Sequence, residues 1–145
     1  MTTRQARIIA AARGWIGTPY HHQASTKGAG CDCLGLVRGV WREVIGSEPA
    51  PLPPYRPDWA EAGGTETLLE AAREHFTPIS VEEAEGGDLL LFRWHSHLPA
   101  KHCAILAEAS TMIHAHDGAA VAEVALTPWW RRHLAGAFRF PGADR

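Results

Sequence analysis

The first half of the chain repeats apolar residues with the period of an α-helix. From Arg4 to Ile16 they recur every three or four positions, which predicts an amphipathic helix with arginines on its outer face. The predicted buried face holds Ile8, Ile9, Ala12, Trp15 and Ile16. Thr3 is a candidate N-cap, and Gly17 together with Pro19 should end the helix.

Two further helices follow the same pattern, at about Cys33–Ile45 and about Thr65–His75. The first of them contains Gly35 and Gly39, one turn apart. A glycine inside a helix costs about 1 kcal/mol relative to alanine. We therefore expect another backbone to pack very close to this helix. Residues 46–64 carry five prolines and predict an extended surface connection within one domain.

From residue 88 onward the apolar period changes to two, which is typical of strands. The predicted strands are residues 88–94, 102–109, 111–116, 119–126 and 136–141. A short helix or turn, "TPWWRRHL", separates the last two. Helices first and an antiparallel sheet second predict an α+β fold.

Length and charge narrow the class of protein. The 145 residues are 46% hydrophobic, enough for one domain with a real core over residues 1–145. The formal net charge of −2 gives no basic surface of the kind that binds nucleic acid. No segment is apolar enough for membrane insertion, and the N-terminus does not resemble a signal peptide, so we expect synthesis in the cytoplasm.

Cysteine chemistry is the next candidate. Three cysteines, Cys31, Cys33 and Cys103, are too few for a disulfide framework, and a Cys-x-Cys pair is too short for the usual zinc spacing. We therefore predict no metal and no cofactor. Cys33 instead follows Asp32 at a predicted helix start, where unpaired amides favour a thiolate and can stabilise an oxyanion. Asp32 itself is a natural N-cap. Cys31 and Cys103 are interpreted as packed, inert thiols.

A histidine near Cys33 would complete the activation of a nucleophile. His102 opens an apolar strand, and His114 and His116 lie on one face of the next strand. If these strands form a hairpin, one histidine can act as general base while another orients it. Spacing alone does not choose between His114 and His116.

The ordered motifs "WIGTPY", "CDCLGLV", "GDLLLF", "KHCAIL" and "MIHAH" resemble the NlpC-type cell-wall cysteine peptidases, a papain-like family. The resemblance is greatest to the subfamily carried by tailed phages and gene transfer agents, and it covers about residues 5–140. It implies a nucleophile helix packed on an antiparallel sheet.

Site roles follow from that resemblance, residue by residue. It implies Cys33 as nucleophile, His102 as catalytic histidine, His114 as third polar residue and Tyr20 as oxyanion donor. Asp32 is a further candidate for substrate contact.

The chain departs from the family pattern where substrate should lie. Leu34 replaces the usual serine, "HHQAS" follows the tyrosine, Cys31 is an extra thiol, and the loop at residues 93–101 is long. Trp94 in that loop is a candidate cleft residue. Trp129 and Trp130 are interpreted as core and rim.

The implied substrate is the peptidoglycan stem peptide, cut between D-glutamate and the diamino acid. With no signal peptide in the sequence, we expect assembly into a phage-like tail or baseplate hub that acts on the periplasmic wall. One alternative is a structural tail-hub subunit with vestigial or docking-dependent activity. Another is an amidase or acyltransferase on the same fold.

Overall fold

A six-stranded antiparallel sheet forms the second half of the fold, in the order β3-β8-β4-β5-β6-β7. The computed structural model describes residues 2–49, 66–108 and 110–142. The strands are β3 (Thr77–Ile79), β4 (Leu89–Phe92), β5 (His102–Leu106), β6 (Thr111–His114), β7 (Ala122–Ala125) and β8 (Leu134–Arg139). All five predicted strands are present, with ends that differ by a few residues. The sequence pattern does not predict strand β3, because a strand of three residues is too short to show an alternation of apolar and polar positions.

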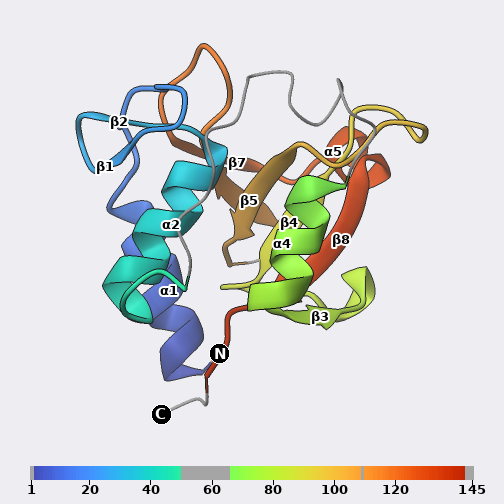
Figure 1. Cartoon of the computed structure of the whole chain (residues 1–145), viewed down its shortest axis with the longest axis horizontal. Coiled ribbons are helices and arrows are strands. Elements are labelled where there is room, and N and C mark those ends of the chain that lie inside the picture. The colour runs from blue at the N-terminus through green and yellow to red at the C-terminus, as the bar shows by residue number, and fades with distance from the viewer. Residues whose placement is uncertain (1, 50–65, 109, 143–145) are drawn as a thin grey trace.

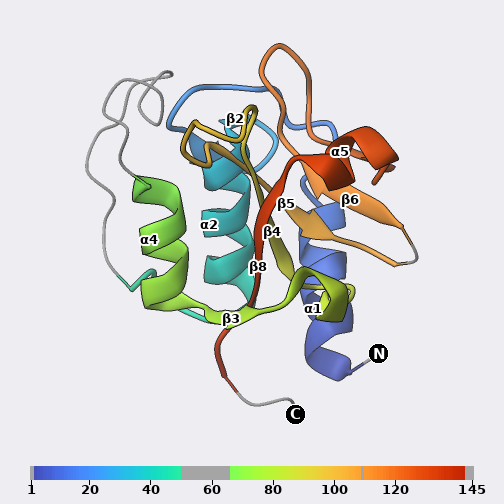
Figure 2. The same ribbon diagram turned by 90° about the vertical axis from the view of Figure 1, so that its right-hand side faces the viewer.

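Three helices cover one face of this sheet, and α1 packs beside α2 (Figures 1 and 2). They are α1 (Thr3–Arg13), α2 (Cys33–Val44) and α4 (Thr67–His75). A 3-10 helix, η1 (Val81–Glu83), and a short helix, α5 (Pro128–Arg132), complete the order. The α+β prediction is therefore confirmed.

Helix α1 begins and ends differently from the prediction. Its N-cap is Thr2 and not Thr3, because Thr2 and Gln5 form a reciprocal capping box. The helix ends at Arg13, and Ile16 beyond it is 47% exposed, although the periodicity placed it on the buried face. The helical period no longer applies to a residue that lies outside the helix.

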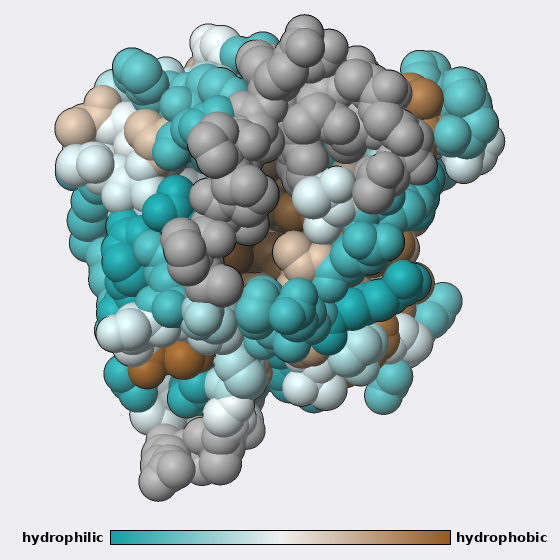
Figure 3. Space-filling model, viewed as in Figure 1, coloured by the Kyte–Doolittle hydropathy of each residue, from teal (hydrophilic) through white to brown (hydrophobic). Residues whose placement is uncertain are grey.

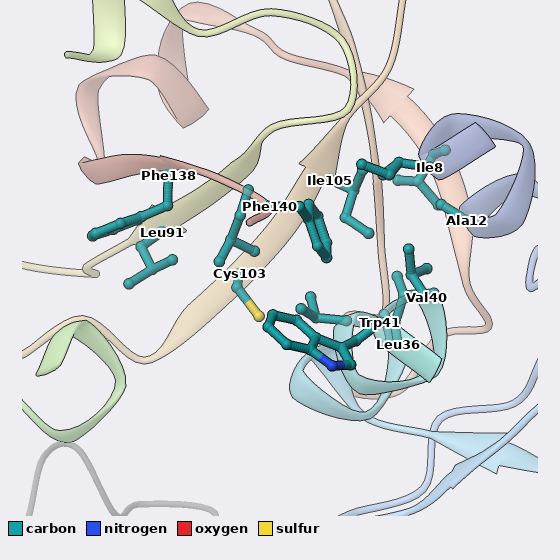
Figure 4. Packing of buried hydrophobic residues seen from close by; sticks show 14 of the residues in the cluster. Ile8, Ala12, Leu36, Val40, Trp41, Leu91, Cys103, Ile105, Phe138 and Phe140 are labelled. Carbon is teal, nitrogen blue, oxygen red and sulfur yellow. The ribbon is translucent and has the colours of Figure 1, made fainter. Parts of the chain in front are cut away.

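The main core lies between the helices and the sheet, and a smaller one lies on the opposite sheet face. Figure 4 shows Leu36, Val40 and Trp41 of α2 facing Cys103 and Ile105 of β5. The smaller cluster contains Leu90, Phe92, Ala104, Leu106, Met112, Leu126 and Ala137. Strands β4 and β5 are thus buried on both faces, which explains their nearly unbroken apolar sequences.

The two glycines of α2 are explained by close packing, but only one of them meets a backbone. A Cβ at Gly35 would lie 1.9 Å from the carbonyl oxygen of Ala24, as expected for backbone contact. A Cβ at Gly39 would lie 2.0 Å from the ring of Trp15, which is a side chain. The first contact holds the start of α2 against the preceding loop, and the second holds its middle against Trp15, which follows α1.

Most of the predicted proline-rich connection lies outside the described residues, which resume at Glu66. Among the helices that the structure describes, none has the length and apolarity needed to cross a bilayer.

Replacing Gly39 with alanine should destabilise the protein, although alanine normally favours a helix. The new methyl group would overlap the Trp15 ring, which is only 2% exposed, so we expect a loss of about 1–3 kcal/mol in the free energy of unfolding. Urea denaturation measures this loss, and the double variant Gly39→Ala/Trp15→Phe should recover part of it. An unchanged or increased stability would show that the ring moves aside without cost.

Candidate active site

The nucleophile candidate Cys33 is the first residue of α2, and Asp32 fixes its position. Asp32 is 2% exposed, and its Oδ1 accepts a hydrogen bond of 2.7 Å from the amide of Gly35. Its Oδ2 accepts another of 2.7 Å from the amide of Gln23. A two-stranded ribbon, β1 (Ser25–Thr26) and β2 (Gly30–Cys31), leads into this turn. The carboxylate therefore caps the helix, as predicted, and also ties the preceding loop to it.

The hairpin of β5 and β6 brings the histidines together, as the sequence predicted. The Nε2 atom of His102 lies 2.9 Å from Nδ1 of His114, within hydrogen-bond distance. Both residues are buried, with exposed fractions of 4% and 5%. His116 is exposed, and its ring centroid lies 5.4 Å from that of His102. The geometry thus selects His114 as the hydrogen-bonded partner of His102.

The surroundings of Cys33 favour its thiolate. A hydrogen bond from the Cys103 thiol has the largest effect and lowers the pKa of Cys33 well below its ordinary value. Burial opposes this shift, and the hydrogen bond and charge of His102 lower the pKa further. Because Nε2 of His102 faces His114, the ring nitrogen available to Cys33 is Nδ1.

Cys103 has a role in this site that the sequence reasoning missed. It is 1% exposed, as expected for a packed thiol, but it projects from β5 toward α2 (Figure 4). Its hydrogen bond to Cys33, together with burial, raises the pKa of Cys103 well above its ordinary value. The raised pKa of Cys103 favours its protonated thiol, while the lowered pKa of Cys33 favours its thiolate. Its position next to His102 in the sequence was the only available signal.

Burial holds His114 in its neutral form. Desolvation is the main cause, followed by the charges of His102 and His116, and together they lower the pKa of His114 to about 3. A neutral imidazole can accept a hydrogen bond at Nδ1 when its proton is on Nε2. His114 can therefore accept a hydrogen bond from the Nε2–H group of His102 both when His102 is neutral and when it is protonated. This hydrogen bond fixes the orientation of the His102 ring.

A cleft of about 270 Å³ opens above these residues. Its lining includes Tyr20, Asp32, Cys33, Trp94 and His102. Burial and then the negative charge of Cys33 raise the pKa of Tyr20, so its hydroxyl stays protonated and can donate. Five of the six predicted site residues therefore line one cleft. The sixth, His114, lies behind His102, within hydrogen-bond distance of it.

Aromatic rings surround the histidines on the sheet face opposite α2. The Trp130 centroid lies 5.6 Å from that of His102, 5.3 Å from that of His114 and 5.8 Å from that of His116. Trp94 lies 5.5 Å from His102. Sequence reasoning assigned Trp130 only to core and rim, because nothing in the local pattern placed α5 against β5 and β6.

A separate apolar hollow of about 350 Å³ lies between α2 and α4, on the face shown in Figure 3. Its walls include Val37, Trp41 and Phe76, and it shares only Leu34 and Leu68 with the cleft. Neither Cys33 nor His102 lines the hollow, although Cys103 does, so the hollow adjoins the reactive centre without opening onto the Cys33 thiol.

Within the described part of the chain, no group of three or more histidine, cysteine or acidic side chains is arranged to hold a metal ion. The arrangement that the structure does show is a thiol, an imidazole and a second, neutral imidazole in a row. This order of groups is that of a cysteine nucleophile with its base and its orienting partner.

Comparison with known proteins identifies the family. Residues 17–139 match the NlpC/P60 family, so this chain belongs to that family. The NlpC/P60 domain of the peptidoglycan hydrolase SagA is 27% identical, with a TM-score of 0.66 over 94% of this chain and 98% of that domain.

Longer proteins contain the same fold. A Staphylococcus aureus protein of the NLP/P60 family, described as similar to a lipoprotein, is 25% identical over 97% of this chain, with a TM-score of 0.65. A Bacillus cereus family protein is 21% identical, also over 97% of this chain, with a TM-score of 0.69. This chain spans 42% and 41% of their respective lengths. No curated protein sequence matches significantly. The fold is therefore the papain-like α+β fold of NlpC/P60 domains, as the motif resemblance implied.

Alkylation of Cys33 should begin at a pH well below the ordinary thiol pKa. We expect iodoacetamide to label Cys33 faster than Cys31 at neutral pH, because Cys31 is fully buried and burial raises its pKa to about 12. Cys103→Ala should move the alkylation profile of Cys33 upward by about one pH unit, since a hydrogen bond to a charged group is lost. Mass spectrometry of the Cys33 peptide gives the rates. Cys103→Ser, which keeps a donor, is the matched control, and superimposable wild-type and alanine profiles would contradict the role of Cys103.

Proposed function

We propose that this protein is a cell-wall hydrolase, a cysteine peptidase that cuts the stem peptides of peptidoglycan. One observation carries the proposal: the Cys33 thiol, with its lowered pKa, lies at a helix start beside the hydrogen-bonded pair His102 and His114. Membership of the NlpC/P60 family supports it, as does the 27% identity to a domain whose parent is a peptidoglycan hydrolase.

In the proposed reaction, the Cys33 thiolate attacks a peptide carbonyl carbon and forms a C–S bond. The amide of Cys33 and the hydroxyl of Tyr20 stabilise the resulting oxyanion. The first-turn amides of α2 suit this task because they have no acceptors within the helix. The raised pKa of Tyr20 suits it too, since only a protonated phenol can donate.

The intermediate then collapses with cleavage of the C–N bond, and His102 delivers its proton to the leaving amine. His102 next removes a proton from water, which attacks the thioester and regenerates the Cys33 thiolate. His114 orients the His102 ring throughout, and its burial prevents it from taking the proton itself. Asp32 and Trp94 line the cleft where the peptide would lie. For the scissile bond, we propose the one between D-glutamate and the diamino acid.

Digestion of purified peptidoglycan tests this function. We expect wild type to release new stem-peptide fragments, and Cys33→Ala to release none, because the nucleophile is lost. Mass spectrometry of the soluble products identifies the bond. Cys31→Ala is a suitable control, since it removes a neighbouring thiol that takes no part in the reaction. Equal release by wild type and Cys33→Ala would contradict the role of Cys33 as nucleophile. Release by neither would contradict the proposal and favour a structural or docking-dependent subunit.

We also propose that the protein acts as a component of a phage-like tail or baseplate, where it opens the wall during entry. The support is the likeness of its motifs to the subfamily carried by tailed phages and gene transfer agents. Purified particles from the source strain should contain the protein at a fixed ratio to the tail proteins, by quantitative mass spectrometry. Finding it free in the periplasm and missing from particles would overturn this placement.

A further inference from the structure

A group of tryptophans extends from the catalytic cleft onto the surface. Trp129 is 47% exposed and, in the described part of the chain, is one of three large apolar side chains with high exposure. The other two, Ile16 and Val81, are aliphatic. The Trp129 ring lies 5.0 Å from Trp130 and 6.2 Å from Trp94, measured between centroids. The exposed Trp129 ring thus lies next to Trp130 and Trp94, and both of these rings lie next to His102.

Local contacts hold the Trp129 ring in place. The ring stacks on His133 at 4.0 Å with an interplanar angle of 24°, and it meets Trp130 edge to face at 88°. His133 also donates from Nδ1 to the carbonyl of Trp129, at 2.6 Å. Thr127 caps this short helix. A ring that is already fixed loses little conformational entropy when a ligand binds.

The same rings line an open pocket of about 730 Å³. Its walls are Trp94, His95, His116, Thr127, Trp129, Trp130 and His133. Two of these residues, Trp94 and His116, also line the catalytic cleft, so the pocket continues from it. Figure 2 shows α5, which carries Trp129, on the opposite side of the sheet from α2 and α4.

The lining matches the chemistry of a sugar ring. A pyranose presents a face of C–H groups with partial positive charge, which packs on the negative face of an indole, and hydroxyl groups at its edge. The imidazoles of His95 and His116 and the hydroxyl of Thr127 offer hydrogen-bond partners around the indoles. None of the residues that line the pocket is a carboxylate, so a cationic amine would find no counter-charge there.

We infer that this pocket binds a pyranose ring of the peptidoglycan glycan strand while the stem peptide lies in the cleft. The inference rests on the proposed function, because it is peptidoglycan that joins a sugar to the peptide to be cut. Trp129 would then be a specificity residue that favours peptides still attached to their glycan over free peptides. Its contact with the sugar would add to binding without any part in proton transfer.

A binding experiment tests the pocket independently of catalysis. An uncharged N-acetylglucosamine tetrasaccharide, titrated into ¹⁵N-labelled Cys33→Ala protein, should shift the indole N–H signals of Trp129 and Trp130 saturably. In the same Cys33→Ala protein, a second substitution, Trp129→Ala, should weaken the affinity for the tetrasaccharide roughly tenfold, equivalent to about 1.4 kcal/mol. Adding Trp129→Phe, which keeps an aromatic face, should weaken it less. Ile16→Ala is the matched control, because Ile16 is equally exposed at 47% but lies outside the pocket. Absence of saturable shifts, or equal affinity with and without Trp129, would overturn the inference.

A kinetic comparison separates this inference from the proposed function. We expect Trp129→Ala to lower kcat/KM for a disaccharide-bearing stem peptide roughly tenfold relative to the same peptide without sugar. An equal fall on both substrates would place the stem peptide on the tryptophans, and no fall on either would show that Trp129 contacts neither; both results would overturn the sugar assignment. Failure of the wild type to cut either substrate would contradict the proposed function, while the titration would still decide whether the pocket binds sugar.

Discussion

The contact between the first residue of α2 and the first residues of β5 is the interaction on which the site depends. Cys33 and His102 line one cleft, and the side chains of Cys103 and His102 together lower the pKa of the Cys33 thiol. These two residues are neighbours in one strand, so a single placement of β5 against α2 supplies both. The apolar packing of α2 on β5, where Leu36 and Trp41 face Cys103 and Ile105, sets that placement (Figure 4).

Burial acts differently on each titratable group around this contact. It helps to raise the pKa values of Tyr20 and Cys103, so that both remain donors, and it lowers that of His114, so that this ring remains neutral. Only Cys33 has partners strong enough to favour its charged form despite burial. The Cys33 thiol therefore ionises more easily than the neighbouring thiol of Cys103 and hydroxyl of Tyr20, which is what a thiolate nucleophile requires.

The α2 segment and the β5–β6 hairpin could be predicted because their signals are local. An apolar stripe at helical spacing begins at Cys33, Asp32 precedes it as a cap, and a short apolar run follows His102. The limits of this reasoning appear where a local signal is weak or shared. Thr2 and Thr3 are equivalent as candidate caps until the partner Gln5 is seen, and Ile16 fits the stripe of α1 although the helix ends before it.

The sequence by itself determined the helix that begins near Cys33 and the strands of the sheet, because apolar periodicity encodes these directly, and the resemblance of its motifs to a known family supplied the candidates Tyr20, His102 and His114. The tertiary structure showed that His114 lies within hydrogen-bond distance of His102, which spacing could not decide between His114 and His116, and it alone showed that Cys103 lowers the pKa of Cys33 and that Trp129 and Trp130 lie beside the cleft. Each of these facts depends on how separate elements pack across the sheet. A contact between distant segments depends on their relative position in three dimensions, which no periodicity along one segment can specify.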